Sequence, residues 1–318
     1  MKVFLQYRPD ETGKGKFTQR LIPELEKVGV KMSTRPKGCD ITLSYTIFRE
    51  ESGNLPKVLR IDGMRLIRDK YDGPRNKAMR RDIDAADAVI WQSKFYKTMI
   101  GGINGSVGRL PYVIFNGADP RDYDDVAPVE TPYRRNIIMS CKWDDQKNKP
   151  RRHKRFKESA KIARDYTAGD PDCCVWIIGN NDERPYENAQ VRYVGWCDEE
   201  KLKHYLRMRC LYVYIPWFDW CPNAVVEAMA SGCYVICSNN GGHAEMVQGY
   251  GRVVDIDRKI KPALITDLAV PEFSRDLVIA EIHHYFDDNP YHAMNPAVHI
   301  AETAKQYKQV FEDVLGGK

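Results

Sequence analysis

Short apolar runs alternate with polar segments long enough to form helices, and this alternation constrains the fold more than any other feature of the chain. In the first part of the sequence the runs have four or five residues and are rich in Val, Ile and Tyr; they are Val3–Tyr7, Ile41–Tyr45, Val58–Ile61, Ala88–Trp91 and Tyr112–Phe115. Helices are predicted between them, including Lys16–Val28 and Lys77–Ala86. Short strands that alternate with helices indicate an α/β protein with a parallel sheet.

The alternation stops once and then restarts, which indicates two similar domains in the 318 residues. The sequence Asn116-Gly-Ala-Asp-Pro120 is typical of a turn, and the acidic stretch up to Pro132 is predicted to be a linker. We therefore predict a Rossmann-like domain at 1–125, a second at 130–290, and a C-terminal helix within 291–318 that could cross back to the first domain. Two such domains favour a ligand site in a central cleft between their sheets.

The predicted elements of the second domain are strands at Asn136–Ser140, Val175–Gly179, Val191–Gly195, Cys210–Ile215 and Tyr234–Ser238, with helices at His153–Tyr166, Glu199–Arg207 and Ala224–Ser231.

The stretch from Pro216 to Val247 carries the most chemical information. Asp219 lies in the loop after a predicted strand, and Glu227 lies in the second turn of the helix that follows. Helical side chains lean toward the N-terminus of their helix, so the two carboxylates can face one pocket and accept hydrogen bonds from sugar hydroxyls. The alternative is structural, with Asp219 as a helix cap and Glu227 interacting with the helix dipole. Further on, Gly241 and Gly242 precede a helix, where their N–H groups could face an anion or form a plain turn.

The residues from Pro222 to Glu245 resemble the signature of the family-4 retaining glycosyltransferases. That family has two Glu residues separated by seven positions, the second within Leu-Glu-Ala-Met-Ala-x-Gly, followed by Gly-Gly-x-x-Glu. This chain has Glu227-Ala-Met-Ala-Ser-Gly232 and then Gly241-Gly-His-Ala-Glu245, with Asp219 in place of the first Glu. The resemblance implies a GT-B fold, that is two Rossmann-like domains with parallel sheets facing a central cleft. It also implies transfer of a sugar from a nucleotide-sugar donor to an acceptor hydroxyl, with the anomeric configuration retained.

Weaker similarities to the same family extend over most of the chain. Cys141-Lys142-Trp143-Asp-Asp-Gln-Lys147 resembles its Gly-Arg-x-x-x-x-Lys, Asn116-Gly-Ala-Asp119 resembles its Asn-Gly-x-Asp, and Gly13-Lys14-Gly15 lies where its first glycine loop would be.

The resemblance implies a role for each matching residue. Lys142 and Lys147 would hold the donor diphosphate, and Glu227 the ribose. Asp219 would contact the donor sugar, assisted by the amides of Trp220, Cys221, Pro222 and Asn223. Fixed cations and helix-terminal amides can stabilise the charge that grows on a departing diphosphate, so no metal and no cofactor is expected. Asp82-Ile-Asp84 and Asp255-Ile-Asp257 read as Asp-x-Asp, a metal motif of the other glycosyltransferase fold, and we expect both to be structural.

Asp62 is the candidate acceptor-side residue in the first domain. It follows a predicted strand, in Arg60-Ile-Asp62-Gly63, where many relatives have a His near the reacting carbon. Its carboxylate could orient the acceptor hydroxyl or the donor sugar, and the alternative is a turn or cap aspartate. The predicted catalytic residues are therefore Asp62, Asp219 and Lys147.

Basic residues are concentrated near the start of the second domain, although the net charge is only +5. Twelve basic and three acidic residues lie between Arg134 and Arg164, and the run Lys149–Lys157 is the densest part. Such a run is usually a solvated helix face, but it could also follow a polyanion. A glycan or other polymer is the expected acceptor. The alternatives are DNA with a hydroxymethylated base, and a non-catalytic nucleic-acid-binding protein on the same fold.

The remaining composition favours a cytoplasmic protein. No apolar stretch approaches the ~20 residues that span a bilayer, and the first residues are too polar for a secretory signal. The nine cysteines are odd in number and form no paired Cys-x-x-Cys motifs, so we expect reduced, buried thiols.

Overall fold

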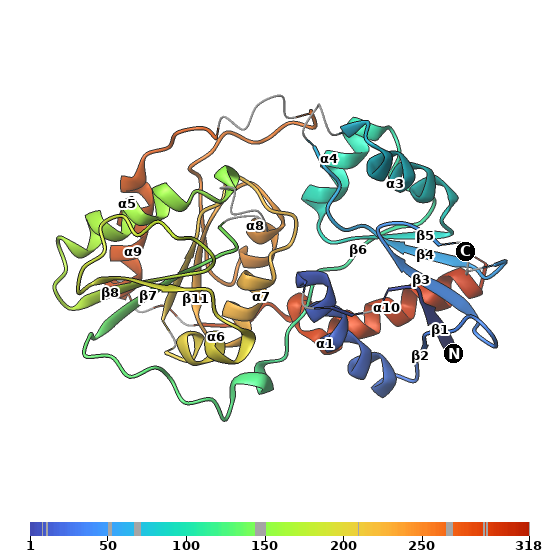
Figure 1. Cartoon of the computed structure of the whole chain (residues 1–318), viewed down its shortest axis with the longest axis horizontal. Helices are drawn as coiled ribbons and strands as arrows, with labels where there is room; N and C mark the ends of the chain where they lie inside the picture. The colour runs from blue at the N-terminus through green and yellow to red at the C-terminus, as the bar shows by residue number, and fades with distance from the viewer. Residues whose placement is uncertain are drawn as a thin grey trace. The chain divides into compact units, whose positions relative to one another are not determined.

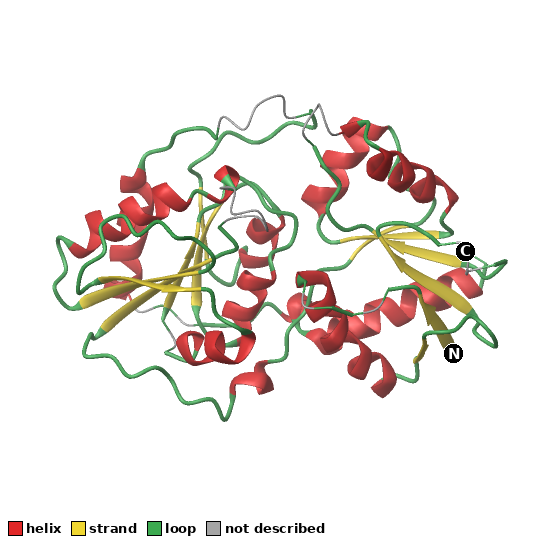
Figure 2. Ribbon diagram, in the orientation of Figure 1, coloured by secondary structure: helices red, strands yellow, loops and turns green. Residues whose placement is uncertain are grey.

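The chain folds into two compact units, each built around its own parallel sheet. The computed structural model describes residues 1–7, 9–10, 12–49, 53–66, 71–143, 151–208, 210–264, 270–288, 290 and 292–317. The first unit comprises Met1–Ala118, Ile260–Asp267 and Pro296–Lys318, and the second comprises Asp119–Lys259 and Leu268–Asn295. Figure 2 shows that each sheet carries helices on both faces.

The sheet of the first unit has six strands among the described residues, all parallel. Their order across the sheet is β2-β1-β3-β4-β5-β6. The strands are β1 (Lys2–Leu5), β2 (Lys31–Ser33), β3 (Ile41–Tyr45), β4 (Lys57–Arg60), β5 (Ala88–Trp91) and β6 (Pro111–Val113). The chain leaves β1 in one direction for β2 and later returns on its other side as β3. The strand order therefore reverses between β1 and β3, the kind of point at which α/β sheets bind ligands.

Helices cover both faces of this first sheet, as Figure 1 shows. α1 (Gly13–Lys27) and α10 (Ile300–Leu315) pack together on one face, and α3 (Pro74–Ala85) and α4 (Lys94–Asn104) lie on the other. The C-terminal helix thus belongs to the first unit, although it follows the second unit in sequence. It contributes to an apolar core with β1, α1 and β3, whose buried members include Val3, Phe17, Leu21, Ile41, Tyr307, Val310 and Phe311.

The sheet of the second unit likewise has six parallel strands in the described part, ordered β12-β11-β10-β7-β8-β9. Its order reverses between β7 and β10. The strands are β7 (Arg135–Ser140), β8 (Cys173–Ile178), β9 (Val191–Gly195), β10 (Leu211–Tyr214), β11 (Tyr234–Ser238) and β12 (Arg252–Val254). The helices are α5 (Phe156–Thr167), α6 (Glu199–Leu206), α7 (Asn223–Ala230), α8 (Gly242–Val247) and α9 (Arg275–Asp288). Short 3-10 helices η2 (Pro120–Tyr123) and η3 (Arg152–Lys154) belong to this unit, and η4 (Pro296–Val298) precedes α10 in the first.

Local sequence signals explain several helix boundaries. The Ser93 hydroxyl accepts the Tyr96 N–H at the start of α4, and Gly105, in the left-handed conformation, ends that helix. Asp198 caps α6 through the Lys201 N–H at 2.8 Å. α3 begins at Pro74, whose missing N–H costs nothing at that position.

The predicted α/β fold and its parallel sheets are confirmed, with small differences in the bounds. The strands predicted at Ile41–Tyr45, Ala88–Trp91, Val191–Gly195 and Tyr234–Ser238 have those bounds in the structure. The edge strands β2 and β12 were not predicted, because each has only three residues and begins with an exposed Lys or Arg. None of the helices in the described part of the chain is long and apolar enough to cross a membrane.

Candidate active site

Asp219 lies at the point where the strand order of the second sheet reverses. It follows β10 by five residues, and its carboxylate forms an ion pair with Lys154, which comes from η3 after β7. Oδ2 also accepts a 2.6 Å hydrogen bond from the Tyr214 hydroxyl, and Oδ1 accepts one of 2.7 Å from the Trp220 N–H. The Tyr214 hydroxyl in turn accepts from the Lys154 ammonium at 3.0 Å. Three groups therefore fix the carboxylate, whose side chain keeps 17% of its surface exposed.

The electrostatics of this pair favour full charge on both partners. Burial alone would raise the pKa of Asp219, but Lys154 and Tyr214 outweigh it and hold the pKa at about 2. Burial alone would lower the pKa of Lys154, but Asp219 outweighs that effect and raises it above its ordinary value. Burial and Asp219 together raise the pKa of Tyr214 well above its usual range. The site thus presents a fixed carboxylate, a fixed ammonium and a neutral hydroxyl.

Two glycines pack the loop before α8 against the backbone of Asp219. The Gly242 N–H donates to the Asp219 carbonyl at 2.8 Å. Gly241 has φ of +139°, and a Cβ built there would lie 2.5 Å from the same carbonyl oxygen. The prediction that both N–H groups could face an anion is therefore wrong for Gly242, whose N–H is bonded within the protein. The glycines instead allow a close approach that holds the Asp219 loop in place.

His243 supports the same loop from inside the protein. Its side chain is fully buried, and Nε2 lies 3.0 Å from the Ser238 hydroxyl. That hydroxyl donates its single proton to the Pro216 carbonyl at 2.5 Å, so it must accept from His243 and Nε2 carries the imidazole proton. Burial lowers the pKa of His243 to about 4, with Asp219 opposing the change and Lys154 assisting it. His243 is therefore neutral near neutral pH.

We expect the neutral His243 to make unfolding pH-dependent. Its folded pKa of about 4 lies below the ordinary value of 6.5, so the unfolded chain binds the extra proton more readily. The stabilisation from His243 should be complete above about pH 6.5 and should be lost as the pH falls toward 4, at about 1.4 kcal/mol per pH unit. Urea unfolding of wild type and His243→Gln between pH 7 and pH 4.5 measures this, and the variant should show the shallower dependence. Equal slopes in wild type and His243→Gln would contradict the prediction.

Five of the predicted donor-binding residues lie around the start of α7: Trp220, Cys221, Pro222, Asn223 and Glu227. Glu227 is half-buried on that helix, and Asn223 is its first residue. Pro222 occupies the N-cap position and has no N–H to offer, so it cannot supply one of the expected amides. The Trp220 N–H is bonded to Asp219, and the Cys221 thiol is buried 3.7 Å from the Met246 sulfur.

The structure adds Lys154 to the lysines that the sequence predicted. Lys142 is exposed just after β7, and Lys147 lies outside the described residues. Lys154 was missed as a site residue, although it reaches the carboxylate predicted to bind the donor sugar. The sequence predicted a helix at His153–Tyr166 with Lys154 in its first turn, whereas Lys154 ends η3 and α5 begins at Phe156.

The basic run Lys149–Lys157 is not a continuous external track in its described part. Lys154 is buried against Asp219, and Arg155 forms ion pairs of 2.6 and 2.8 Å with Asp257, with both side chains fully buried. Arg152 and Lys157 are exposed. The expectation of a single charged surface is corrected for Lys154 and Arg155, because each has an internal carboxylate partner.

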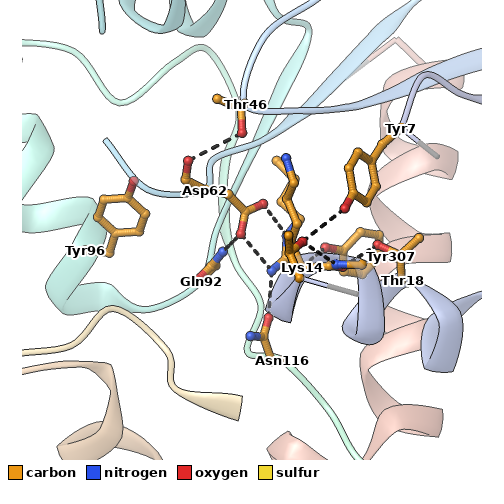
Figure 3. Close-up of polar contacts among 12 residues, drawn as sticks. Tyr7, Lys14, Thr18, Thr46, Asp62, Gln92, Tyr96, Asn116 and Tyr307 are labelled. Carbon is orange, nitrogen blue, oxygen red and sulfur yellow. Dashed lines mark hydrogen bonds and ion pairs between the residues drawn. The ribbon is translucent and has the colours of Figure 1, made fainter. Parts of the chain in front are cut away.

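Asp62 lies in the first unit, just beyond β4, and several neighbours fix it (Figure 3). Arg60 donates through Nε to Oδ2 at 2.9 Å and through Nη2 to Oδ1 at 3.3 Å. The Gln92 amide also donates to Oδ1, and the Asp62 carbonyl accepts from the Thr46 hydroxyl at 3.4 Å. The Asp62 side chain keeps 14% of its surface exposed. Asp62 thus lies where the parallel strands end, and its carboxylate is fixed but still partly exposed.

The glycines Gly13 and Gly15 form the first turn of α1, which begins three residues earlier than predicted because Thr12 caps it. A Cβ at Gly15 would lie 1.9 Å from the Asp10 carbonyl, so this position requires glycine. The nearby Lys14 ammonium lies 4.4 Å from the centre of the Tyr7 ring.

The two Asp-x-Asp motifs have partners within the protein. Asp257 pairs with Arg155, and Asp82 accepts the Phe48 N–H at 2.7 Å. Within the described ranges, no three His, Cys, Asp or Glu side chains gather as a metal site would require. All nine cysteines are free thiols; eight are buried and Cys197 is half-buried.

Comparison with known proteins gives one family match and several similar structures. Residues 148–267 match the family model described as Glycosyl transferases group 1. No curated protein sequence matches the chain. Among solved structures, a sucrose-phosphate synthase from Thermosynechococcus elongatus superposes with a TM-score of 0.66 at 14% identity, covering 100% of this chain and 99% of that one. A glycosyltransferase from Rickettsia africae gives a TM-score of 0.61 at 12% identity, covering 100% and 99%.

A third similar structure is that of Anabaena HepE in complex with UDP. Its TM-score is 0.56 at 14% identity, and the match covers 99% of this chain and 96% of that one. Both units therefore have the architecture of GT-B glycosyltransferases. Residues 148–267 are thus similar to the group 1 glycosyl transferases, and the chain as a whole has the GT-B fold.

Proposed function

We propose that the chain transfers a sugar from a nucleotide-sugar donor to a hydroxyl of a glycan or other polymer, retains the anomeric configuration and needs no metal. The observation that carries this proposal is the Lys154–Asp219 pair. It lies where the strand order of the second sheet reverses, within the segment that matches the glycosyltransferase model. An ammonium beside a partly exposed carboxylate suits a ligand that carries both phosphate and sugar hydroxyls.

The donor side of the reaction can be assigned to named groups. Lys154 has three N–H donors; two point to Asp219 and Tyr214, and the third can bind a diphosphate oxygen. Lys142, and the predicted Lys147, would add charge to the same group. Negative charge grows on the diphosphate as the bond to the sugar breaks, so fixed cations stabilise the transition state more than the ground state. Glu227 would accept hydrogen bonds from the ribose, and Asp219 from the sugar.

On the acceptor side, Asp62 would accept a hydrogen bond from the attacking hydroxyl. The bond from the acceptor oxygen to the anomeric carbon forms as the bond from that carbon to the diphosphate oxygen breaks. The hydroxyl proton then passes to an oxygen of the departing diphosphate. This assignment gives Asp62 an orienting role and requires no enzyme nucleophile.

A nucleotide screen followed by product analysis tests the function. Two solved structures of Anabaena HepE contain UDP, one of them with glucose, so UDP and UDP-glucose are the first probes. A nucleotide at 100 times its dissociation constant should stabilise the protein by about 2.7 kcal/mol. Mass spectrometry should then find the sugar on a small oligosaccharide, with its anomeric configuration unchanged by NMR. If sugar is found only on DNA with a hydroxymethylated base, DNA replaces the glycan as the proposed acceptor. Absence of both binding and transfer with every nucleotide sugar tested would refute the proposal.

Glu227→Ala should weaken nucleotide binding more than it slows transfer. Loss of a charge-assisted hydrogen bond costs roughly 1.5–3 kcal/mol, which corresponds to about a 10- to 150-fold weaker affinity. Isothermal titration calorimetry with UDP measures this. Glu200→Ala is the matched control, because Glu200 is an exposed residue of α6 paired only with Lys203 in the described structure. Equal affinity in Glu227→Ala and wild type would remove Glu227 from the donor site.

A further inference from the structure

Arg60 is an unusual residue for the middle of a sheet. It ends β4, a central strand of the first unit, and its side chain is fully buried beside the apolar Val58 and Leu59. A buried guanidinium is costly unless its charge and its N–H groups are paired. An aliphatic side chain at this position would pack the core without that cost. Arg60 therefore calls for an explanation beyond packing.

The contacts of Arg60 connect three parts of the first unit. Nε and one Nη2 proton bind the two oxygens of Asp62. The other Nη2 proton binds the Asn116 side-chain oxygen at 2.7 Å, in the loop after β6. Nη1 donates to the Tyr307 hydroxyl of α10 at 2.9 Å. Figure 3 shows Asp62, Gln92, Asn116 and Tyr307 gathered in this one cluster.

Aromatic rings fix the plane of the guanidinium. Its central carbon lies 4.1 Å from the centre of the Phe17 ring and 5.2 Å from that of Tyr45. Burial alone would lower the pKa of Arg60, but Asp62 and the two tyrosines outweigh it and raise the pKa above its ordinary value. Arg60 is thus a permanent cation with one orientation, and that orientation fixes the carboxylate of Asp62.

We propose that Arg60 is the positioning residue for Asp62, and that Tyr307 makes the C-terminal helix part of the acceptor site by holding Arg60 in place. This inference rests on the proposed function, in which Asp62 orients the acceptor hydroxyl. Arg60 and Gln92 both donate to the Asp62 carboxylate and hold it in one orientation, in which its exposed part would meet the acceptor. Tyr307 is fully buried, so it would act through Arg60 and not on the substrate itself.

The chain provides a matched pair of tyrosines to test this. The Tyr307 hydroxyl links α10 to Arg60. The Tyr112 hydroxyl links the same helix to β6, through a 2.7 Å bond to Asp313. Replacement of either Tyr by Phe keeps the ring and removes one hydroxyl that anchors α10. Only the Tyr307 change disturbs the contacts of Asp62.

The experiment compares UDP-glucose transfer to maltooligosaccharides by wild type, Tyr307→Phe, Tyr112→Phe and Arg60→Lys. We expect kcat to fall about tenfold in Tyr307→Phe and about 100-fold in Arg60→Lys, because a small misplacement of an orienting group has a large effect on rate. Lys keeps the charge but not the planar fork that binds both carboxylate oxygens. UDP affinity by calorimetry should stay within twofold of wild type in all variants, and Tyr112→Phe should keep wild-type kcat.

The possible failures can be told apart. A wild-type protein that transfers no sugar from any nucleotide sugar overturns the proposed function and this inference together. Active wild type with equal loss of kcat in Tyr307→Phe and Tyr112→Phe would show that α10 acts only through stability, and would overturn the inference alone. Unchanged kcat in Tyr307→Phe with reduced kcat in Arg60→Lys would remove Tyr307 from the proposal.

Discussion

Lys154→Met should lower both the stability of the second unit and the rate of sugar transfer. The change leaves Asp219 largely buried without its cation, since the two side chains are 17% and 9% exposed in the pair. Loss of one partner of a buried pair costs about 3–5 kcal/mol. Transfer should fall by about 100-fold or more in kcat/KM, because the variant also loses a cation that would stabilise the leaving diphosphate. Urea unfolding and donor kinetics at a temperature where the variant is folded measure the two effects.

A second lysine separates the role of Lys154 from that of charge in general. Lys157 is exposed in the first turn of α5, so Lys157→Met should change stability by no more than about 0.5 kcal/mol and leave transfer unchanged. The double variant Lys154→Met/Asp219→Asn should recover part of the lost stability but none of the activity. Recovery of activity as well would mean that Lys154 serves only to neutralise Asp219.

The fold could be predicted from the sequence because its signal is repeated many times. Most central strands are short runs rich in Val, Ile, Leu or Tyr, and both faces of a parallel sheet are covered, so strands such as β3 and β5 are buried along their whole length. The edge strands β2 and β12 lack that signal, since each is short and partly exposed. The start of α1 was placed too late because Gly13 and Gly15 read as a loop, whereas Thr12 begins the helix before them.

The candidate site was predicted less completely, because spacing along the chain does not reveal partners. Asp219 and Glu227 lie on one strand-loop-helix segment, and their local pattern was sufficient to select them. Lys154 is 65 residues before Asp219 in sequence, and only the pairing of β7 with β10 brings them to the same edge. A lysine in the first turn of a predicted helix is also typical of an exposed surface residue. Its burial could be recognised only from the structure.

Asp62 shows the same limit in the first unit. The sequence selected it by its place after a strand, but its environment comes from residues far along the chain. Asn116 and Tyr307 reach the adjacent Arg60 from 56 and 247 residues away. No local pattern could have indicated that the C-terminal helix contributes a hydroxyl to this cluster.

Arg155→Met should destabilise the second unit as strongly as any single change in the chain. Arg155 and Asp257 are both fully buried and joined by two hydrogen bonds of 2.6 and 2.8 Å. Arg155 also donates to the Pro271 carbonyl at 3.0 Å and lies over the Phe273 ring. Its removal leaves a buried carboxylate with no other charge partner among the described residues, at a cost of about 3–5 kcal/mol. Denaturant unfolding should therefore show a much lower midpoint, with Asp257→Asn giving a similar loss.

The neighbouring Arg152 is the control, since it is exposed and Arg152→Met should cost less than about 0.5 kcal/mol. The double variant Arg155→Met/Asp257→Leu removes both charges and replaces them with apolar side chains. A buried pair is often no more stable than such a replacement, so the double variant should be clearly more stable than either single change. Because Arg155 follows Lys154 directly and has a positive φ of 59°, the pair also fixes the backbone that directs Lys154 toward Asp219. The double variant should therefore recover stability while transfer remains slow. If the double variant instead loses as much stability as the two single variants combined, Arg155 and Asp257 act independently.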